Sequence, residues 1–225
     1  MSFLKYIISS IILSLLSILP ISLNSHINLF NLIFNIPILE DSSFISLTTL
    51  TISITLLFLN RPHTKKECIT ILPLLPSILP LIITNIFISY NILNYKILVT
   101  EILINLGLLL TIKKKKEIKI INYKNIFLIS ILLLTIKLAN ISTLLLIYLS
   151  LKNYYQKEKL QRYSFILYSI TLLSTIKPFT WNYYYLPSII LTPLITTYFY
   201  KKNHKISKLI ITEIIICVFT LFWLR

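Results

Sequence analysis

Glu40 and Asp41 are the only two carboxylic residues that adjoin in this sequence. An adjacent pair of carboxylates can supply a general base, which takes a proton from an attacking hydroxyl group, or oxygen ligands for a cation. The pair also fits a purely structural role, because Asp41 precedes two serines and an apolar run, which is typical of a helix N-terminus. We expect Glu40 and Asp41 to be catalytic residues, with helix capping as the alternative.

A second chemically dense segment, KPFTWNYYYLP, occupies residues 177–187. It combines a cation with an indole, an amide and three phenols. A cation suits a phosphate, while aromatic faces and hydrogen-bonding groups suit a sugar, so the segment predicts a binding site; the alternative is an aromatic belt at a membrane surface. The expected substrate-binding residues here are Lys177, Trp181, Asn182, Tyr183 and Tyr184.

No metal site or cofactor is expected. The three histidines and two cysteines show no metal-ligand spacing, and the single glycine, Gly107, excludes glycine-rich loops that cradle phosphates. Scarcity of glycine and alanine also means that close helix packing must rely on serine and threonine, which occur in runs such as Ser9-Ser10 and Thr48-Thr49.

The elements that must position these residues are helices in lipid. The chain has 225 residues, 56% of them hydrophobic, and a mean hydropathy of +0.83. Its apolar residues form continuous blocks near bilayer length rather than alternating strands, which favours helices over a barrel. The formal charge of +15 lies in short clusters between these blocks, so we expect no nucleic-acid partner.

We therefore predict an all-α fold: residues 1–225 form a single integral membrane domain, a polytopic transmembrane helical bundle of about seven to eight membrane segments. Pro73, Pro76 and Pro80 should kink or break the third segment. The expected apolar segments are residues 6–23, 44–60, 68–92, 96–112, 126–151, 163–176, 183–200 and 206–224.

The segment 126–151 decides the topology. If it crosses the membrane once, the basic clusters at 113–124 and 152–162 fall on opposite sides. If it is a broken or re-entrant hairpin with its tip at residues 137–140, both clusters face the cytoplasm, together with Lys5 and the basic residues of 61–66 and 201–208. This places 18 of the 22 basic residues inside, so we expect the hairpin in a multi-pass cell-membrane protein. Residues 40, 41 and 177–185 then face outward.

Charged residues within apolar segments are costly, which makes Glu101, Lys137 and Glu213 candidates for function. The alternatives are structural: Glu101 can pair with Lys137, and Glu213 with Lys208. We expect Lys137, at the tip of the hairpin, to bind substrate.

The break TIKLAN at residues 135–140, the basic loop at 152–162 and the Pro, Trp and Tyr segment at 177–187 follow one another in an order that resembles membrane-embedded C-type glycosyltransferases, especially those that use polyprenyl-phosphate mannose. The resemblance covers residues 126–197. It implies a reduced glycosyltransferase-like protein that acts on lipid-linked sugars at the outer face, with membrane lipids and a polyprenyl-phosphate sugar as partners. The alternatives are a small transporter that uses the charged residues within the membrane, or a non-catalytic subunit of a membrane complex.

Overall fold

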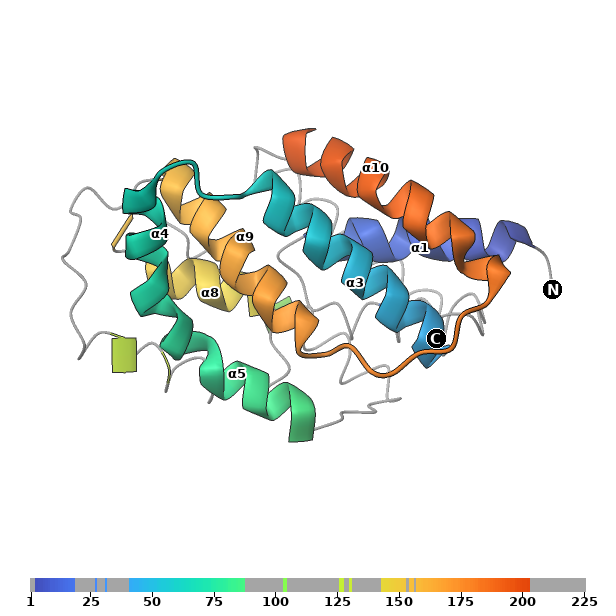
Figure 1. Cartoon of the computed structure of the whole chain (residues 1–225), viewed down its shortest axis with the longest axis horizontal. Helices are drawn as coiled ribbons and strands as arrows, with labels where there is room; N and C mark the ends of the chain where they lie inside the picture. Colours follow the sequence, from blue (N-terminus) through green and yellow to red (C-terminus); the bar gives the residue numbers. More distant parts are fainter. Residues whose placement is uncertain are drawn as a thin grey trace.

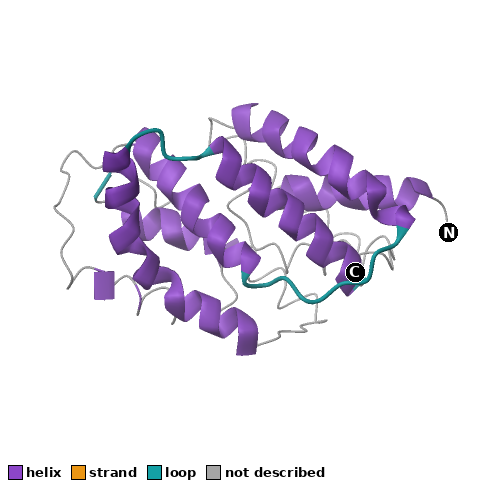
Figure 2. Cartoon of the chain, in the orientation of Figure 1, coloured by secondary structure: helices purple, strands orange, loops and turns teal. Residues whose placement is uncertain are grey.

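The computed structural model describes residues 3–18, 41–87, 143–152, 154–155 and 157–202, together with positions 27, 31, 103, 104, 126, 127 and 130. Throughout this described part the chain forms helices joined by turns and loops, and it forms no strand (Figures 1 and 2). The prediction of an all-helical fold is confirmed for these described residues. The prediction that residues 1–225 form one domain stays a prediction.

Three helices run side by side in the same direction: α1 (Phe3–Ile18), α3 (Ser42–Leu59) and α10 (Leu186–Lys202) (Figure 1). Their contact surfaces are rich in small hydroxyl residues that recur every four positions and therefore share one face of a helix. Small side chains let helix backbones approach closely. The buried examples are Ser10 and Ser14 on α1, Ser188, Thr192 and Thr196 on α10, and Thr49 and Ser53 on α3.

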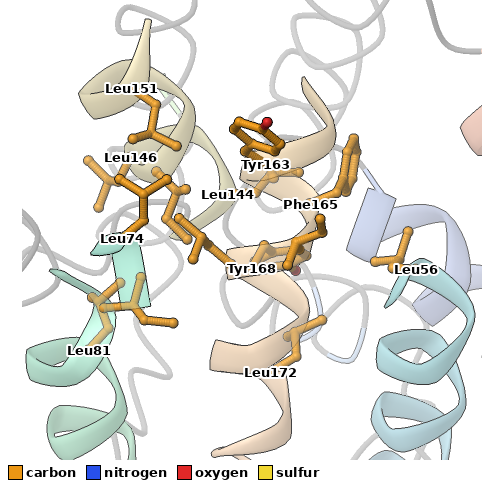
Figure 3. Close-up of a cluster of buried hydrophobic side chains, with 14 of the residues drawn as sticks. Leu56, Leu74, Leu81, Leu144, Leu146, Leu151, Tyr163, Phe165, Tyr168 and Leu172 are labelled. Atoms are coloured by element: carbon orange, nitrogen blue, oxygen red, sulfur yellow. The ribbon is translucent and has the colours of Figure 1, made fainter. Parts of the chain in front are cut away.

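The helix α9 (Lys157–Leu173) runs antiparallel to α3 and packs against it, and the short α8 (Thr143–Leu151) packs on α9. Apolar side chains from α3, α8, α9 and the third expected segment form the main core (Figure 3). Leu56, Leu74, Leu146 and Leu167 in this core are at most 1% exposed. Burial of this apolar surface fixes α9 in the middle of the described helices.

The third expected segment is broken as predicted. It consists of α4 (Lys65–Ile71), a 3₁₀ turn η2 (Leu72–Leu74) and α5 (Leu75–Phe87), with a visible bend between α4 and α5 (Figure 1). Pro73 lies at the start of η2, and Pro80 lies inside α5. A proline has no backbone N–H and clashes with the preceding turn, which accounts for the change in helix geometry.

Within the described residues, two helical stretches are long and apolar enough to cross a membrane: Ser42–Leu59 and Lys65–Ile83. This is fewer than the seven to eight predicted segments. The helices α9 and α10 have 17 residues each, and α9 opens on six residues of which only Leu160 is apolar, so neither meets the length and hydropathy of a full span. Residues 206–224 and the tip of the proposed hairpin lie outside the described residues. Positions 103 and 104 are described in the segment 96–112, and positions 126, 127 and 130 and α8 are described in the segment 126–151.

The bundle of described helices has two ends. The Asp41 end comprises the starts of α1, α3 and α10 and the loop at 174–182; the Arg162 end comprises the end of α3, the starts of α4 and α9 and the end of α10. Lys5 was expected beside the basic residues of 61–66, and this is wrong: the neighbouring Tyr6 stacks on Tyr184, which places Lys5 at the Asp41 end. Because α1 and α3 are parallel, both begin at the same end.

Candidate functional site at the Asp41 end

Asp41 is the N-cap of α3. Its backbone is extended, with φ of −69° and ψ of 102°, and its Oδ1 accepts hydrogen bonds from the backbone N–H groups of Ser43 (3.0 Å) and Phe44 (3.2 Å). These groups have no acceptor within the helix, and an aspartate at this position supplies one. The capping role, which the sequence left as the alternative, is therefore present.

The second carboxylate oxygen of Asp41 reaches across the bundle. The hydroxyl of Tyr185 donates a hydrogen bond of 2.8 Å to Asp41 Oδ2, although the two residues are 144 positions apart. Tyr185 belongs to the 3₁₀ turn η3 (Tyr183–Tyr185), which leads into α10, and is only 5% exposed. Burial first, and then the bond to the Asp41 carboxylate, raises the pKa of Tyr185 to about 12. The phenol stays protonated and ties α10 to α3.

An aromatic cluster surrounds this bond. Tyr6 of α1 stacks on Tyr184, with ring centroids 5.7 Å apart and planes 7° from parallel, and meets Phe44 edge-on at 5.3 Å. Phe44 in turn contacts the ring of Tyr185 at 5.8 Å. The cluster joins α1, α3 and η3, so Tyr184 and Tyr185 help to hold the Asp41 end together.

The loop at 174–182 lies against the start of α3. The backbone N–H of Lys177 donates to Ser46 Oγ at 3.2 Å, and that of Thr180 donates to Ser43 Oγ at 3.4 Å. Asn182 caps η3, because its Oδ1 accepts from the backbone N–H of Tyr184 at 3.1 Å. The bonds to Ser43 and Ser46 hold the loop beside the start of α3 (Figure 1).

The expected binding residues differ in their exposure. Lys177 and Asn182 are exposed, Trp181 is 58% exposed and Tyr183 is 63% exposed, whereas Tyr184 is half-buried in the aromatic cluster. The structure thus brings Asp41 and the segment 177–185 to one end of the molecule. Glu40, Lys137, Glu101 and Glu213 lie outside the described residues, and the expected roles of all these residues stay predictions.

Sequence reasoning missed an ion pair at the opposite end. Arg162 of α9 donates to both carboxylate oxygens of Glu67, at 3.0 Å and 3.2 Å, and also to the backbone carbonyl of Arg61 at 3.0 Å. Glu67 further accepts from the backbone N–H of His63 at 2.8 Å, and Thr64 caps α4. The Thr64-x-x-Glu67 spacing is a signal for a helix start, but a partner 95 residues away leaves no local signal.

Further polar and aromatic contacts occupy the same end. The Tyr200 hydroxyl donates to Oδ1 of the buried Asn60, which joins the end of α10 to the end of α3. The Arg61 guanidinium lies 5.1 Å from the centroid of the Phe58 ring. Across the part of the chain that the structure describes, no three His, Cys, Asp or Glu residues are grouped to hold a metal ion.

No protein-family model matches this chain, and neither a curated protein nor a solved structure is detectably similar to it.

Proposed function

We propose that the chain is a multi-pass membrane protein whose Asp41 end binds a lipid-linked sugar phosphate at the outer face and transfers its sugar. The observation that carries the proposal is the hydrogen bond between Tyr185 and Asp41 at 2.8 Å. It anchors the segment 177–185 beside Asp41, one residue of the carboxylate pair. A glycosyltransferase needs both regions at one end of the molecule.

The surface of the described helices supports a lipid environment. Large apolar side chains point outward along α3, α4 and α10, where Phe58 is 67%, Ile69 69% and Leu194 64% exposed. Two helical stretches have the length and hydropathy of membrane spans. Hydrocarbon around these side chains removes the cost of exposing them to water.

The charges at the two ends support an orientation. Among the described side chains, the Asp41 end has two lysines, Lys5 and Lys177, and the Arg162 end has seven basic residues. An excess of Lys and Arg marks the cytoplasmic side of a membrane protein, so the Arg162 end is cytoplasmic and the Asp41 end faces outward. The seven are Arg61, Lys65, Lys66, Lys152, Lys159, Arg162 and Lys201.

At the outer end, different exposed side chains contact the phosphate and the sugar. Lys177 meets the phosphate of the lipid carrier, and the rings of Trp181 and Tyr183 provide faces for the sugar. The Asn182 carbonyl oxygen is occupied by the Tyr184 backbone N–H, which leaves its amide N–H₂ for a sugar hydroxyl. Lys137 is a second cation for the phosphate.

In the transfer step, the oxygen of an acceptor hydroxyl forms a bond to the anomeric carbon of the sugar. The bond from that carbon to the phosphate oxygen breaks, polyprenyl phosphate leaves with the electron pair, and a carboxylate takes the hydroxyl proton. Asp41 already accepts three hydrogen bonds, so we assign the base role to its neighbour Glu40 and a positioning role to Asp41.

The experiment is a binding assay with a polyprenyl phosphate on the purified protein in detergent. Lys177→Ala should weaken binding roughly tenfold, since a charge-assisted contact to a phosphate contributes about 1.5 kcal/mol or more. Lys5→Ala is the matched control, because it removes an exposed lysine at the same end and should leave binding intact. Unchanged binding in both Lys177→Ala and Trp181→Ala would contradict the proposal.

A second arm separates an enzyme from a non-catalytic subunit. Glu40→Gln should retain polyprenyl-phosphate binding and lose sugar transfer from the lipid-linked donor. If Glu40→Gln and Asp41→Asn both transfer sugar at the wild-type rate, the carboxylate pair has no catalytic role.

A further inference from the structure

The turn between α3 and α4 concentrates positive charge at the Arg162 end. Arg61, Lys65 and Lys66 are all exposed there. Among the carboxylates whose side chains the structure describes, Glu67 alone lies at this end, and both of its oxygens are bonded to Arg162. The described acidic groups therefore do not neutralise these three cations.

The turn that carries the cations is fixed by hydrogen bonds. The Arg61 carbonyl accepts from the Arg162 guanidinium at 3.0 Å, and the His63 backbone N–H donates to Glu67 at 2.8 Å. Thr64 caps α4 through its side chain. A fixed turn loses little conformational freedom when it binds a ligand, which favours affinity.

Apolar side chains continue the surface away from the cations. Lys65 and Ile69 of α4 and Leu72, the first residue of η2, follow one another at four and three positions and so lie along one face. Ile69 is 69% and Leu72 66% exposed. On α3, the exposed Phe58 ring lies under the Arg61 guanidinium at 5.1 Å. On α4 the cations therefore lie at the start of the helix and exposed apolar side chains follow them along one face, while Phe58 lies beside Arg61 at the end of α3.

We infer that the turn with Arg61, Lys65 and Lys66, together with the exposed apolar side chains that flank it on α3 (Phe58) and along α4 and η2 (Ile69 and Leu72), binds an anionic phospholipid of the cytoplasmic leaflet. The cations contact the phosphodiester headgroup, and the apolar side chains line the acyl chains. Charge complementarity selects an anionic over a zwitterionic lipid. The inference rests on the membrane location in the proposed function and is independent of the site at the Asp41 end.

The test compares binding of short-chain phosphatidylglycerol and phosphatidylcholine, both dioctanoyl, to the purified full-length protein in detergent by native mass spectrometry. Wild type should prefer phosphatidylglycerol, and this preference should fall roughly fivefold for each of the lysines removed in Lys65→Gln/Lys66→Gln. Lys66→Gln is matched by Lys5→Gln, an exposed lysine at the other end, which should bind like wild type.

Equal binding of the two lipids, or equal loss in Lys66→Gln and Lys5→Gln, would overturn the inference. Displacement of phosphatidylglycerol by millimolar inorganic phosphate would also overturn it, since the site would then recognise a free anion. The polyprenyl-phosphate assay reports separately on the Asp41 end. If polyprenyl-phosphate binding does not depend on Lys177 while phosphatidylglycerol selectivity is intact, the proposed function alone is refuted. If polyprenyl-phosphate binding depends on Lys177 while phosphatidylglycerol selectivity is absent, this inference alone is refuted.

Discussion

The bond between Asp41 and Tyr185 should contribute to stability through a coupling that a double-mutant cycle can measure. In Tyr185→Phe the carboxylate loses one charge-assisted hydrogen bond of 2.8 Å, a net contribution of about 1.5 kcal/mol for a half-buried acceptor that water can still reach. In Asp41→Ser the cap is retained, but the shorter side chain no longer reaches Tyr185. The buried phenol then loses the carboxylate that accepts its hydrogen bond, which costs about 1–3 kcal/mol.

Because both changes remove the same bond, the double variant Asp41→Ser/Tyr185→Phe should be more stable than the sum of the single effects by about 1–2 kcal/mol. Unfolding of the purified protein by SDS in mixed micelles, followed by near-ultraviolet circular dichroism, measures all four corners. A control cycle uses Tyr184→Phe in place of Tyr185→Phe. Tyr184 stacks on Tyr6 in the same aromatic cluster, whereas the bond to Asp41 is made by Tyr185. Additivity within about 0.5 kcal/mol would refute the coupling.

Three further outcomes are expected. Arg162→Lys should lower the free energy of unfolding by about 1 kcal/mol in the same titration, since an ammonium cannot pair with both oxygens of the partly exposed Glu67; no loss would mean that the paired geometry contributes nothing. The raised pKa of Tyr185 means that its contribution to stability is present below pH 10 and is lost as pH rises toward about 12. The difference in absorbance between wild type and Tyr185→Phe, followed as a function of pH, measures the ionisation of this phenol. A midpoint near pH 10 would contradict the raised pKa. Thr192→Val should raise thermal stability, because it removes a buried hydroxyl that has no hydrogen-bond partner among the described residues. Thr48→Val should lower it, because that hydroxyl donates to the Phe44 carbonyl; equal effects of the two changes would contradict this assignment.

Local features of the fold were predictable because they depend on short stretches of sequence. The apolar run at 44–60 and the preceding Asp41 predict α3 and its cap, which the structure has at Ser42–Leu59. Pro73 predicts the break after α4. The start of α9 was placed too late, at residue 163 rather than Lys157, because its polar first turns form a helix without adding hydropathy.

Long-range features were not predictable in the same way. Charge counting assigns each loop to a side but carries no information on which helices pack in parallel, so it placed Lys5 at the wrong end. The Arg162–Glu67 pair and the Tyr185–Asp41 bond join residues 95 and 144 positions apart. In the candidate site, the composition of 177–187 indicated which residues matter, but only the packing of α10 on α3 brings them to Asp41.

The most direct test of the account concerns the two ends of the bundle and the two sides of a membrane. Cys68 is exposed near the Arg162 end, and Thr180 is exposed in the loop at the Asp41 end. The backbone N–H of Thr180, rather than its side chain, donates the bond to Ser43. In a Cys217→Ser background, a membrane-impermeant maleimide should label Thr180→Cys on intact cells and should label Cys68 only after permeabilisation. Labelling of both positions from the same side would contradict a membrane-spanning bundle with a cytoplasmic Arg162 end and an outer Asp41 end.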